Sequence, residues 1–440
     1  MKKFVAMFLT LALTFGSFCF AGGEEYDYDH AFGELEDRVV YLEEKKNTAL
    51  LTPEKFYVFS ENGAANVYET GLAAKDIKAM FTDESAAYYL TGSTRGYQLI
   101  YTLNRVTQNG LKKNGSIYFP PKERTEPNYT ENFIPYGVRY TLYKKSVVFE
   151  AIPRTEDGVM SPVQFGFILN SLSPFFSMEE DTSRMRINQH GYYVNGHFIM
   201  PAGWNGKQSE YFGKQFSASE HGGYDSLLYM PNLHDFALKN GNKVSLFFTE
   251  DYADKDLIKN ILKNERSGLF MCDNEFPDST GDPLPKYSQP ELIVEAYGEN
   301  TLIQGDITEF GNGILSVGKD ADENSGGFKN AYIAFYDKDV RKAKKTFITD
   351  FTKKDEAKVS TPRIMQYDKD TYVLWYETKD GKTVMKYGKL NKNAAFDGTL
   401  FTVEKDGIVP IRPLMRENKL YYVTETDGAY SINTKNIKAQ

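Results

Sequence analysis

Short runs of aromatic and β-branched residues, separated by glycine and asparagine, make up most of the chain. Residues 56–59 lead through Asn62-Gly63 to a second such run at residues 66–68. Aromatic and β-branched residues favour strands, and an Asn-Gly pair between two short runs is typical of a β-hairpin. The same succession predicts hairpins at five further places, which are residues 87–101, 138–149, 240–242, 312–313 and 380–381.

Helical spacing is clearest in one segment, residues 255–263, where Leu257, Ile258, Ile261 and Leu262 repeat as they would along one face of a helix. The rest of the chain favours strands, and its load of 31 Tyr and 31 Phe strengthens that pattern. We therefore expect an all-β protein.

A longer pattern repeats towards the C-terminus. Residues 360–390 and 411–432 both contain a proline, a short polar turn, an aromatic run and an Asp-Gly pair. Aligning Leu374 with Tyr422 gives a spacing of 48 residues, and an earlier run at residues 313–317 lies 59 residues before residues 372–376. A period of roughly 40–50 residues is typical of four-stranded propeller blades.

The repeat predicts a single β-propeller of six or seven four-stranded blades, with long loops in the middle third of the chain. Leu374 and Tyr422 should then occupy equivalent positions in successive blades, with Pro362 and Pro413 before equivalent strands. A β-sandwich is the alternative architecture, but it gives no reason for the repeat. Closed propellers commonly pair strands from the two chain ends, so residues 39–42 or 56–59 should lie beside C-terminal strands.

The first 21 residues have the pattern of a secretory signal peptide. Lys2 and Lys3 precede an apolar run at residues 4–20, and small residues at positions 19 and 21 fit cleavage near Ala21. We expect export to the periplasm, the cell surface or the medium. Residues 22–35 should then form a flexible acidic segment, and residues 36–440 the propeller domain.

Charge and cysteine content limit the partners. Loss of Lys2 and Lys3 takes the formal charge from −8 to −10, which gives no electrostatic reason to bind nucleic acid. No apolar run after residue 21 is long enough to span a bilayer, so membrane insertion is not expected. Cys272 is the one cysteine left after cleavage, so the exported chain can form no internal disulfide.

Three segments share a pattern of strands and turns: HGYYVNGHFIMPAGWNG (190–206), SQPELIVEAYGENTLI (288–303) and STPRIMQYDKDTYVLWYE (360–377). The first contains two strands joined by Asn195-Gly196, and the second a hairpin that turns at residues 298–300. These segments resemble the first strands of blades in the sialidase-like, BNR-repeat propellers. The resemblance implies a propeller, normally of six blades.

The motifs that carry catalysis in that family are not intact in this chain. The Asp-box turn, Ser-x-Asp-x-Gly-x-x-Trp, occurs only as fragments at residues 378–381 and 426–428. Gln289 stands before Pro290, where catalytic members have a glutamate. The arginine triad that grips a substrate carboxylate has no evident counterpart among Arg139, Arg184, Arg186, Arg363 and Arg412. The resemblance therefore implies the fold and not a sialidase mechanism.

Four of the five histidines lie between residues 190 and 234, in the irregular middle of the chain. Within the stretch SEHGGYDS (219–226), two glycines allow a tight turn that would bring Glu220, His221 and Asp225 together. An acid and a base so placed could do general acid–base chemistry, and these three are the catalytic candidates. The alternative is a solvated hairpin loop. No histidine pair has a standard metal-ligand spacing.

An aromatic ring in an open loop can stack on a sugar. Trp204 lies in Ala-Gly-Trp-Asn-Gly, where no strand pattern surrounds it, and we consider it a ligand-binding residue together with His190, Asn205 and Tyr224. Ordinary loop residues are the alternative. Trp375 lies inside an apolar run and should belong to the core.

The stretch DADENSGG (320–327) begins like a calcium loop, with Asp320, Asp322 and Asn324 at alternate positions. Ser325 stands where such a loop needs glycine, and Ala331 where it needs a bidentate glutamate. A calcium ion held by these three residues and water is one interpretation, and an acidic solvated turn is the other.

These observations lead to an exported, non-catalytic propeller that recognises a glycan or protein ligand through its loop-rich face. A glycoside hydrolase of sialidase-like fold is the alternative, and a scaffold within an envelope complex is a second one. No cofactor is expected apart from calcium.

Overall fold

A computed structural model describes the chain over residues 38–60, 64–83, 85–95, 98–119, 138–143, 145–151, 154–155, 158–159, 163–175, 192–194, 197–200, 212–217, 224–229, 236–240, 243–249, 267–275, 286–287, 291–298, 301–398 and 400–437. Two three-residue 3-10 helices, η1 (Ala74–Asp76) and η4 (Lys353–Asp355), interrupt these ranges, and their other regular elements are strands. The protein is therefore all-β, as predicted. The expected helix at residues 255–263 lies outside the described residues. No helix in the described ranges has the length and apolarity needed to cross a membrane.

The first four antiparallel sheets use consecutive parts of the chain. The β1–β4 sheet contains β1 (Val39–Leu42), β2 (Asn47–Leu51), β3 (Lys55–Phe59) and β4 (Ala65–Glu69). The β5–β8 sheet contains β5 (Ile77–Thr82), β6 (Ala86–Arg95), β7 (Gln98–Thr107) and β8 (Lys112–Phe119). The β9–β14 sheet contains β9 (Val138–Tyr143), β10 (Ser146–Ala151), β13 (Val163–Ile168) and β14 (Ser173–Phe175), with the separate hairpin β11 (Arg154–Thr155) and β12 (Gly158–Val159). The β15–β18 sheet contains β15 (Tyr192–Val194), β16 (His197–Met200), β17 (Phe212–Ser217) and β18 (Tyr224–Tyr229).

Four more antiparallel sheets complete the described chain. The β19–β23 sheet contains β19 (Phe236–Asn240), β20 (Lys243–Thr249), β21 (Gly268–Glu275), β22 (Lys286–Tyr287) and β23 (Glu291–Glu295). The β24–β27 sheet contains β24 (Ile303–Phe310), β25 (Gly313–Asp320), β26 (Asn330–Asp337) and β27 (Lys342–Phe347). The β28–β32 sheet contains β28 (Lys358–Val359), β29 (Arg363–Tyr367), β30 (Asp370–Lys379), β31 (Lys382–Lys389) and β32 (Phe401–Glu404). The β33–β35 sheet contains β33 (Leu414–Arg416), β34 (Lys419–Thr426) and β35 (Ala429–Asn436).

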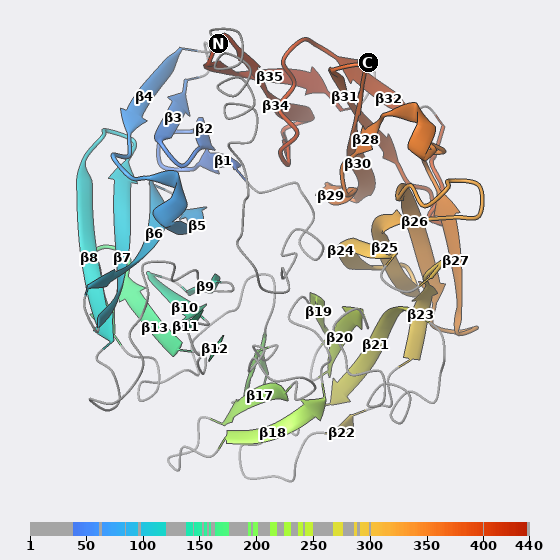
Figure 1. Cartoon of the computed structure of the whole chain (residues 1–440), viewed down its shortest axis with the longest axis horizontal. Coiled ribbons are helices and arrows are strands. Elements are labelled where there is room, and N and C mark those ends of the chain that lie inside the picture. Colours follow the sequence, from blue (N-terminus) through green and yellow to red (C-terminus); the bar gives the residue numbers. More distant parts are fainter. Residues whose placement is uncertain are drawn as a thin grey trace, which may run out of the picture.

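The sheets follow one another around a ring in chain order (Figure 1). The strands nearest the middle of this ring are β1, β5, β9, β19, β24 and β29, each near the start of its own sheet (Figure 1). Sheets arranged in this way give a propeller-like fold. The predicted six or seven blades are not confirmed, because the described residues form eight sheets of three to five strands besides the β11–β12 hairpin.

The β24–β27, β28–β32 and β33–β35 sheets carry apolar side chains on both faces, and a neighbouring sheet packs against each face. In β30, Tyr372, Leu374 and Tyr376 pack towards the β33–β35 sheet. The alternate residues Val373 and Trp375 pack towards the β24–β27 sheet. Trp375 is fully buried, which confirms its prediction as a core residue. A strand that is buried on both faces has apolar residues at consecutive positions instead of alternate ones. This explains the aromatic run that recurs in residues 360–390 and 411–432.

The sequence repeat marks the second strand of successive sheets. Pro362 and Pro413 stand directly before β29 and β33, which are the hairpin partners of β30 and β34, so their equivalence is confirmed. The alignment of Leu374 with Tyr422 is wrong by one residue. The side chains of Leu374 and Tyr422 lie in one cluster and face each other from two neighbouring sheets. The counterpart of Leu374 is Tyr421, which is opposite Leu414 as Leu374 is opposite Arg363, and which packs towards the β1–β4 sheet. A slip of one residue moves a side chain to the other face of a strand.

The predicted hairpins are confirmed at all six places, by the pairs β3–β4, β6–β7, β9–β10, β19–β20, β24–β25 and β30–β31. The strands on either side of Asn195-Gly196 also pair, with Val194 opposite His197. The hairpin predicted at residues 298–300 is wrong, because β23 pairs with β21 and β24 begins the next sheet. That segment therefore connects two sheets.

The two ends of the described chain meet through side chains. Val39, Tyr57 and Phe59 form one apolar cluster with Ile411 and Val423 of the C-terminal segment. Within the described residues β1 pairs with β2 and with no C-terminal strand, so the expected pairing of residues 39–42 or 56–59 is wrong. Packing between two sheets, rather than a shared ladder, joins these residues to the C-terminal sheet.

Buried tyrosines make up much of the packing between sheets, and several use their hydroxyls as donors. The Tyr376 hydroxyl donates to the carbonyl oxygen of Ile411 at 2.7 Å, and the Tyr336 hydroxyl donates to Glu291 Oε1 at 2.5 Å. Burial raises the pKa of Tyr387 to about 12, and burial with the bond to Glu291 raises the pKa of Tyr336 to about 12. The folded state therefore favours the neutral, protonated hydroxyls of Tyr336 and Tyr387.

We expect the protein to unfold in alkali as a result. A folded pKa raised from 10.0 to about 12 contributes stability that is fully present below pH 10 and is lost as the pH rises through the folded value. Tyrosinate absorbance and circular dichroism, followed together in an alkaline titration, should show a steep ionisation step that coincides with unfolding. Tyr387→Phe should reduce the size of that step. Complete ionisation with an unchanged dichroism spectrum would contradict this expectation.

Candidate functional site

Most of the residues proposed from the sequence for catalysis or ligand binding cannot be placed. Glu220, His221, His190, Trp204 and Asn205 lie outside the described residues. Their roles stay predictions.

Tyr224 and Asp225 lie on β18, the last strand of the β15–β18 sheet. In the antiparallel pairing with β17, Tyr224 is opposite Phe216 and Asp225 is opposite Gln215. The pairing fixes the backbone position of these two candidates at the beginning of a strand, directly after the SEHGG stretch.

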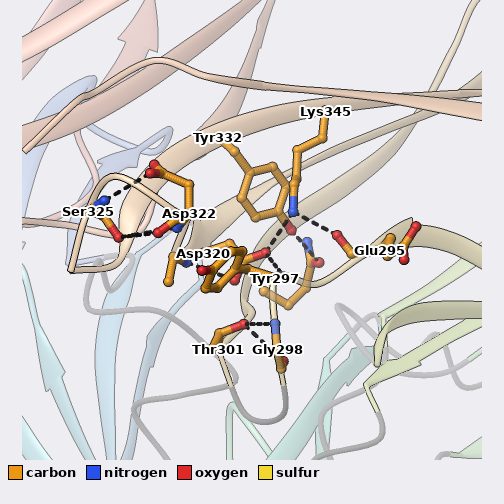
Figure 2. Close-up of polar contacts among 11 residues, drawn as sticks. Glu295, Tyr297, Gly298, Thr301, Asp320, Asp322, Ser325, Tyr332 and Lys345 are labelled. Carbon is orange, nitrogen blue, oxygen red and sulfur yellow. Dashed lines mark hydrogen bonds and ion pairs between the residues drawn. The ribbon is translucent and has the colours of Figure 1, made fainter. Parts of the chain in front are cut away.

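The proposed calcium residues lie where β25 ends and a loop leads to β26. Asp320 is the last residue of β25 and is fully buried. Figure 2 shows Lys345 and the backbone of Tyr297 converging on its carboxylate. Asp320 Oδ2 accepts from Lys345 Nζ at 2.7 Å and from the Tyr297 N–H at 2.9 Å, and Oδ1 accepts from the Ala321 N–H at 2.8 Å.

Lys345 is held from several sides. Its ammonium also donates to the carbonyl oxygen of Glu295 at 2.7 Å, and it lies 5.8 Å from the centre of the Tyr332 ring (Figure 2). These contacts give a buried aspartate a positive partner and further donors, which is the condition for keeping a charge inside a protein. Burial raises the pKa of Tyr332, and the charge of Asp320 adds to that effect. The Asp320–Lys345 pair thus connects the end of β23 with β25 and β27.

Asp322 shapes the loop that follows. Its Oδ1 accepts from the backbone N–H of Ser325 at 2.9 Å (Figure 2). The same oxygen accepts from the backbone N–H of Asn324 at 2.7 Å. Side chains of Asp commonly stabilise turns in this way. In the described part of the chain, no three His, Cys, Asp or Glu side chains lie close enough together to hold a metal ion. A calcium ion at Asp320, Asp322 and Asn324 stays a prediction, and binding through Asp320 would have to displace the Lys345 ammonium.

A second polar cluster, which the sequence analysis did not propose, is formed by residues of β24 and β29 and of the segment before β33. Asp306 of β24 accepts from Arg363 Nη1 of β29 at 2.9 Å through Oδ1. Its Oδ2 accepts from the Ile364 N–H at 2.9 Å and lies 3.3 Å from Arg412 Nη2. Arg412 Nη2 also donates to the Ile364 carbonyl oxygen at 2.9 Å. We call Asp306, Arg363 and Arg412 the Asp306 tie.

The local sequence explains how Asp306 reaches two arginines. The pairing of β24 with β25 shifts between Gln304 and Ile307, so Gly305 and Asp306 form an irregularity in the strand. Such bulges turn a side chain away from its regular direction. A Cβ atom on Gly305 would lie 2.5 Å from the carbonyl oxygen of Pro362, so only glycine lets β24 approach the segment before β29 this closely.

The Asp306 tie joins three successive parts of the ring. Asp306 belongs to the β24–β27 sheet, Arg363 to the β28–β32 sheet, and Arg412 precedes β33. The side chains of Asp306 and Arg363 are 14% and 8% exposed, so water screens their attraction weakly. Arg363 and Arg412 are two of the arginines considered from the sequence for gripping a ligand carboxylate. The carboxylate that they hold here belongs to the chain itself.

The sequence contained one usable signal for this cluster. Gly305 interrupts an otherwise regular strand pattern at residues 303–310, and a glycine inside a strand often marks a bulge or a close approach. An acidic residue directly after such a glycine could therefore have been proposed. Its arginine partners are 57 and 106 residues away in the chain, and no local pattern links them to it.

Comparisons with known proteins concern the fold alone. No protein-family model matches the chain, and no curated protein matches it. Among solved structures, the β-propeller domain of the trilobed protease from Pyrococcus furiosus is 13% identical, with a TM-score of 0.36, over 80% of this chain and 98% of that one. The WD40 domain of SCAP from fission yeast is 8% identical, with a TM-score of 0.44, over 93% and 97%. Virginiamycin B lyase from Staphylococcus aureus is 10% identical, with a TM-score of 0.33, over 79% and 93%.

We expect Asp306→Asn to lower the free energy of unfolding by about 3–5 kcal/mol, because it leaves the buried Arg363 without its carboxylate. Urea denaturation would measure the change. Glu309→Gln is the matched control, since Glu309 lies on the same strand and forms an exposed pair with Lys338 at 3.4 Å. That pair should contribute less than about 1 kcal/mol. Equal effects of the two substitutions would show that the Asp306 tie does not stabilise the ring.

Proposed function

We propose that this chain is an exported, non-catalytic propeller protein, which recognises a glycan or a protein ligand through a loop-rich face. The binding residues are Trp204, His190, Asn205 and Tyr224, and the loops between residues 201 and 225 provide most of the surface. Export follows from the signal-peptide pattern, with cleavage near Ala21.

The observation that best supports a binding function is the composition of the strands nearest the middle of the ring. In propellers this is where side chains from several sheets can meet around one ligand. β1, β5, β9, β19 and β29 carry no Asp or Glu, and β24 carries Asp306 and Glu309. Asp306 is tied to two arginines and Glu309 is paired with Lys338. Glycosidases use two carboxylates that face each other at about 5–10 Å, and these described strands do not offer such a pair.

A glycoside hydrolase of sialidase-like fold is the second candidate function. It would take its acid and base from Glu220, His221 and Asp225, and the pair Gly222-Gly223 between them favours that grouping. The third candidate, an envelope scaffold, would need no pocket and would present its outer strands to partners. Calcium at Asp320, Asp322 and Asn324 would be compatible with each of these functions.

Trp204→Ala and Glu220→Gln separate the candidates. If the protein binds a glycan, Trp204→Ala should weaken binding by about 1–3 kcal/mol, the scale of one aromatic side chain that covers a ligand. Glu220→Gln should abolish turnover if the protein is a hydrolase and leave affinity unchanged if it is a binder. A glycan array would find the ligand, and calorimetry would measure both variants.

Tyr118→Ala is the matched control for Trp204→Ala, because Tyr118 is an exposed aromatic residue on the outer strand β8. It should leave the affinity for a glycan unchanged. If Trp204→Ala unfolds the protein, or if no glycan or protein ligand binds the native chain, the scaffold function becomes the better explanation.

A further inference from the structure

The last sheet has fewer strands than its neighbours. In the described part of the chain, β33, β34 and β35 pair in that order, and β35 pairs with β34 alone. The other seven sheets of the ring contain four or five strands. The outer edge of β35 therefore presents backbone N–H and C=O groups that no described strand satisfies, and such an edge is a template for a further strand.

The adjoining sheet shows the place that a fourth strand would cover. Val39, Leu50, Tyr57 and Val67 are opposite one another on β1, β2, β3 and β4, so they form one row on one face. The first three are 1–6% exposed, but Val67 is 47% exposed. Tyr57 on the third strand contacts Tyr430 of β35, with ring centres 5.3 Å apart. Val67 therefore lies next to the uncovered space beside β35.

The second sheet provides an internal comparison. Ile117 lies on β8, the fourth strand of the β5–β8 sheet, and faces the four-stranded β9–β14 sheet. It is 4% exposed. A neighbouring sheet with four strands thus covers a fourth-strand residue, whereas the three-stranded sheet leaves Val67 open.

The two faces of β35 differ in charge and polarity. Tyr430 and Ile432 point towards the β1–β4 sheet and belong to its apolar cluster. On the opposite face, Asn433 accepts from Lys405, and Lys435 Nζ donates to the Thr402 carbonyl oxygen at 3.2 Å. A strand that suits this edge would present apolar side chains on one face and acidic side chains on the other.

Residues 22–37, which directly precede β1, have this pattern. They include seven Asp or Glu and no Lys or Arg, and Tyr26-Asp27-Tyr28-Asp29 alternates aromatic and acidic side chains. Alternation places Tyr26 and Tyr28 on one face of a strand and the two aspartates on the other. The seven residues 31–37 can extend over roughly 23 Å, which exceeds the width of three strand spacings of about 5 Å each.

We propose that residues 24–30 pair with β35 as the fourth strand of the last sheet, with the tyrosines over Val67 and the aspartates near Lys405 and Lys435. The ring is then closed by strand pairing between the N-terminal segment and β35. The pairing segment precedes residues 39–42 and 56–59, which the sequence analysis proposed for this role. The occupant is a segment of the same chain, so the pairing does not depend on protein concentration.

Amide hydrogen exchange of β35 tests this pairing in the exported chain. The β35 amides that do not pair with β34 should exchange about tenfold more slowly in the intact protein than in a variant that lacks residues 22–37. A synthetic peptide of residues 22–37, added to that variant, should restore the protection, and a peptide of the same composition in scrambled order should not.

Point substitutions provide a second test that does not require the deletion variant to fold. Tyr28→Pro removes a ladder donor and should expose the same β35 amides, whereas Glu34→Pro, outside the proposed strand, should leave them protected. Unprotected β35 amides in the intact protein would overturn the proposal. So would protection that survives the deletion, or protection that is lost on dilution, which would indicate a second copy of the chain as the occupant.

Discussion

Apolar packing between facing sheets is the interaction on which the rest of the structure depends. A single sheet is too narrow to bury its own side chains. The β1–β4, β5–β8, β24–β27, β28–β32 and β33–β35 sheets carry apolar residues on both faces, so each is stable only between two neighbours. Five clusters show this packing between consecutive sheets, and a sixth joins the first sheet to the last. The position of the described polar groups near the middle of the ring, such as Asp306 and its two arginines, follows from this arrangement.

The sequence predicted the parts of the fold that local chemistry decides. Turn pairs located the hairpins, and the recurrence of proline before an apolar run identified equivalent strands at Pro362 and Pro413. It could not decide between Tyr421 and Tyr422 as the counterpart of Leu374, because a strand that is buried on both faces has no polar alternation to show which residues point to which face. The number of sheets depends on packing between distant segments, and the repeat covered only the C-terminal part of the chain.

The candidate site was harder to predict for a physical reason. Asp306, Arg363 and Arg412 meet because three sheets stack in order, so their spacing in the sequence reflects the length of the intervening sheets and not the chemistry of the cluster. The DADENSGG stretch was visible because its spacing is local. Even there, the partner of Asp320 is Lys345, which the sequence places in a different strand.

The Asp306 tie also restricts how this chain can change in evolution. Proteins made of repeated units commonly gain or lose one unit by duplication or deletion of a gene segment. Here the acceptor lies in one unit, the first donor in the next and the second donor in the linker to a third. An inserted or deleted unit would separate Arg412 from Asp306 and leave charges inside the ring unmatched. This third of the chain should therefore be inherited with a constant number of units, whatever happens elsewhere along it.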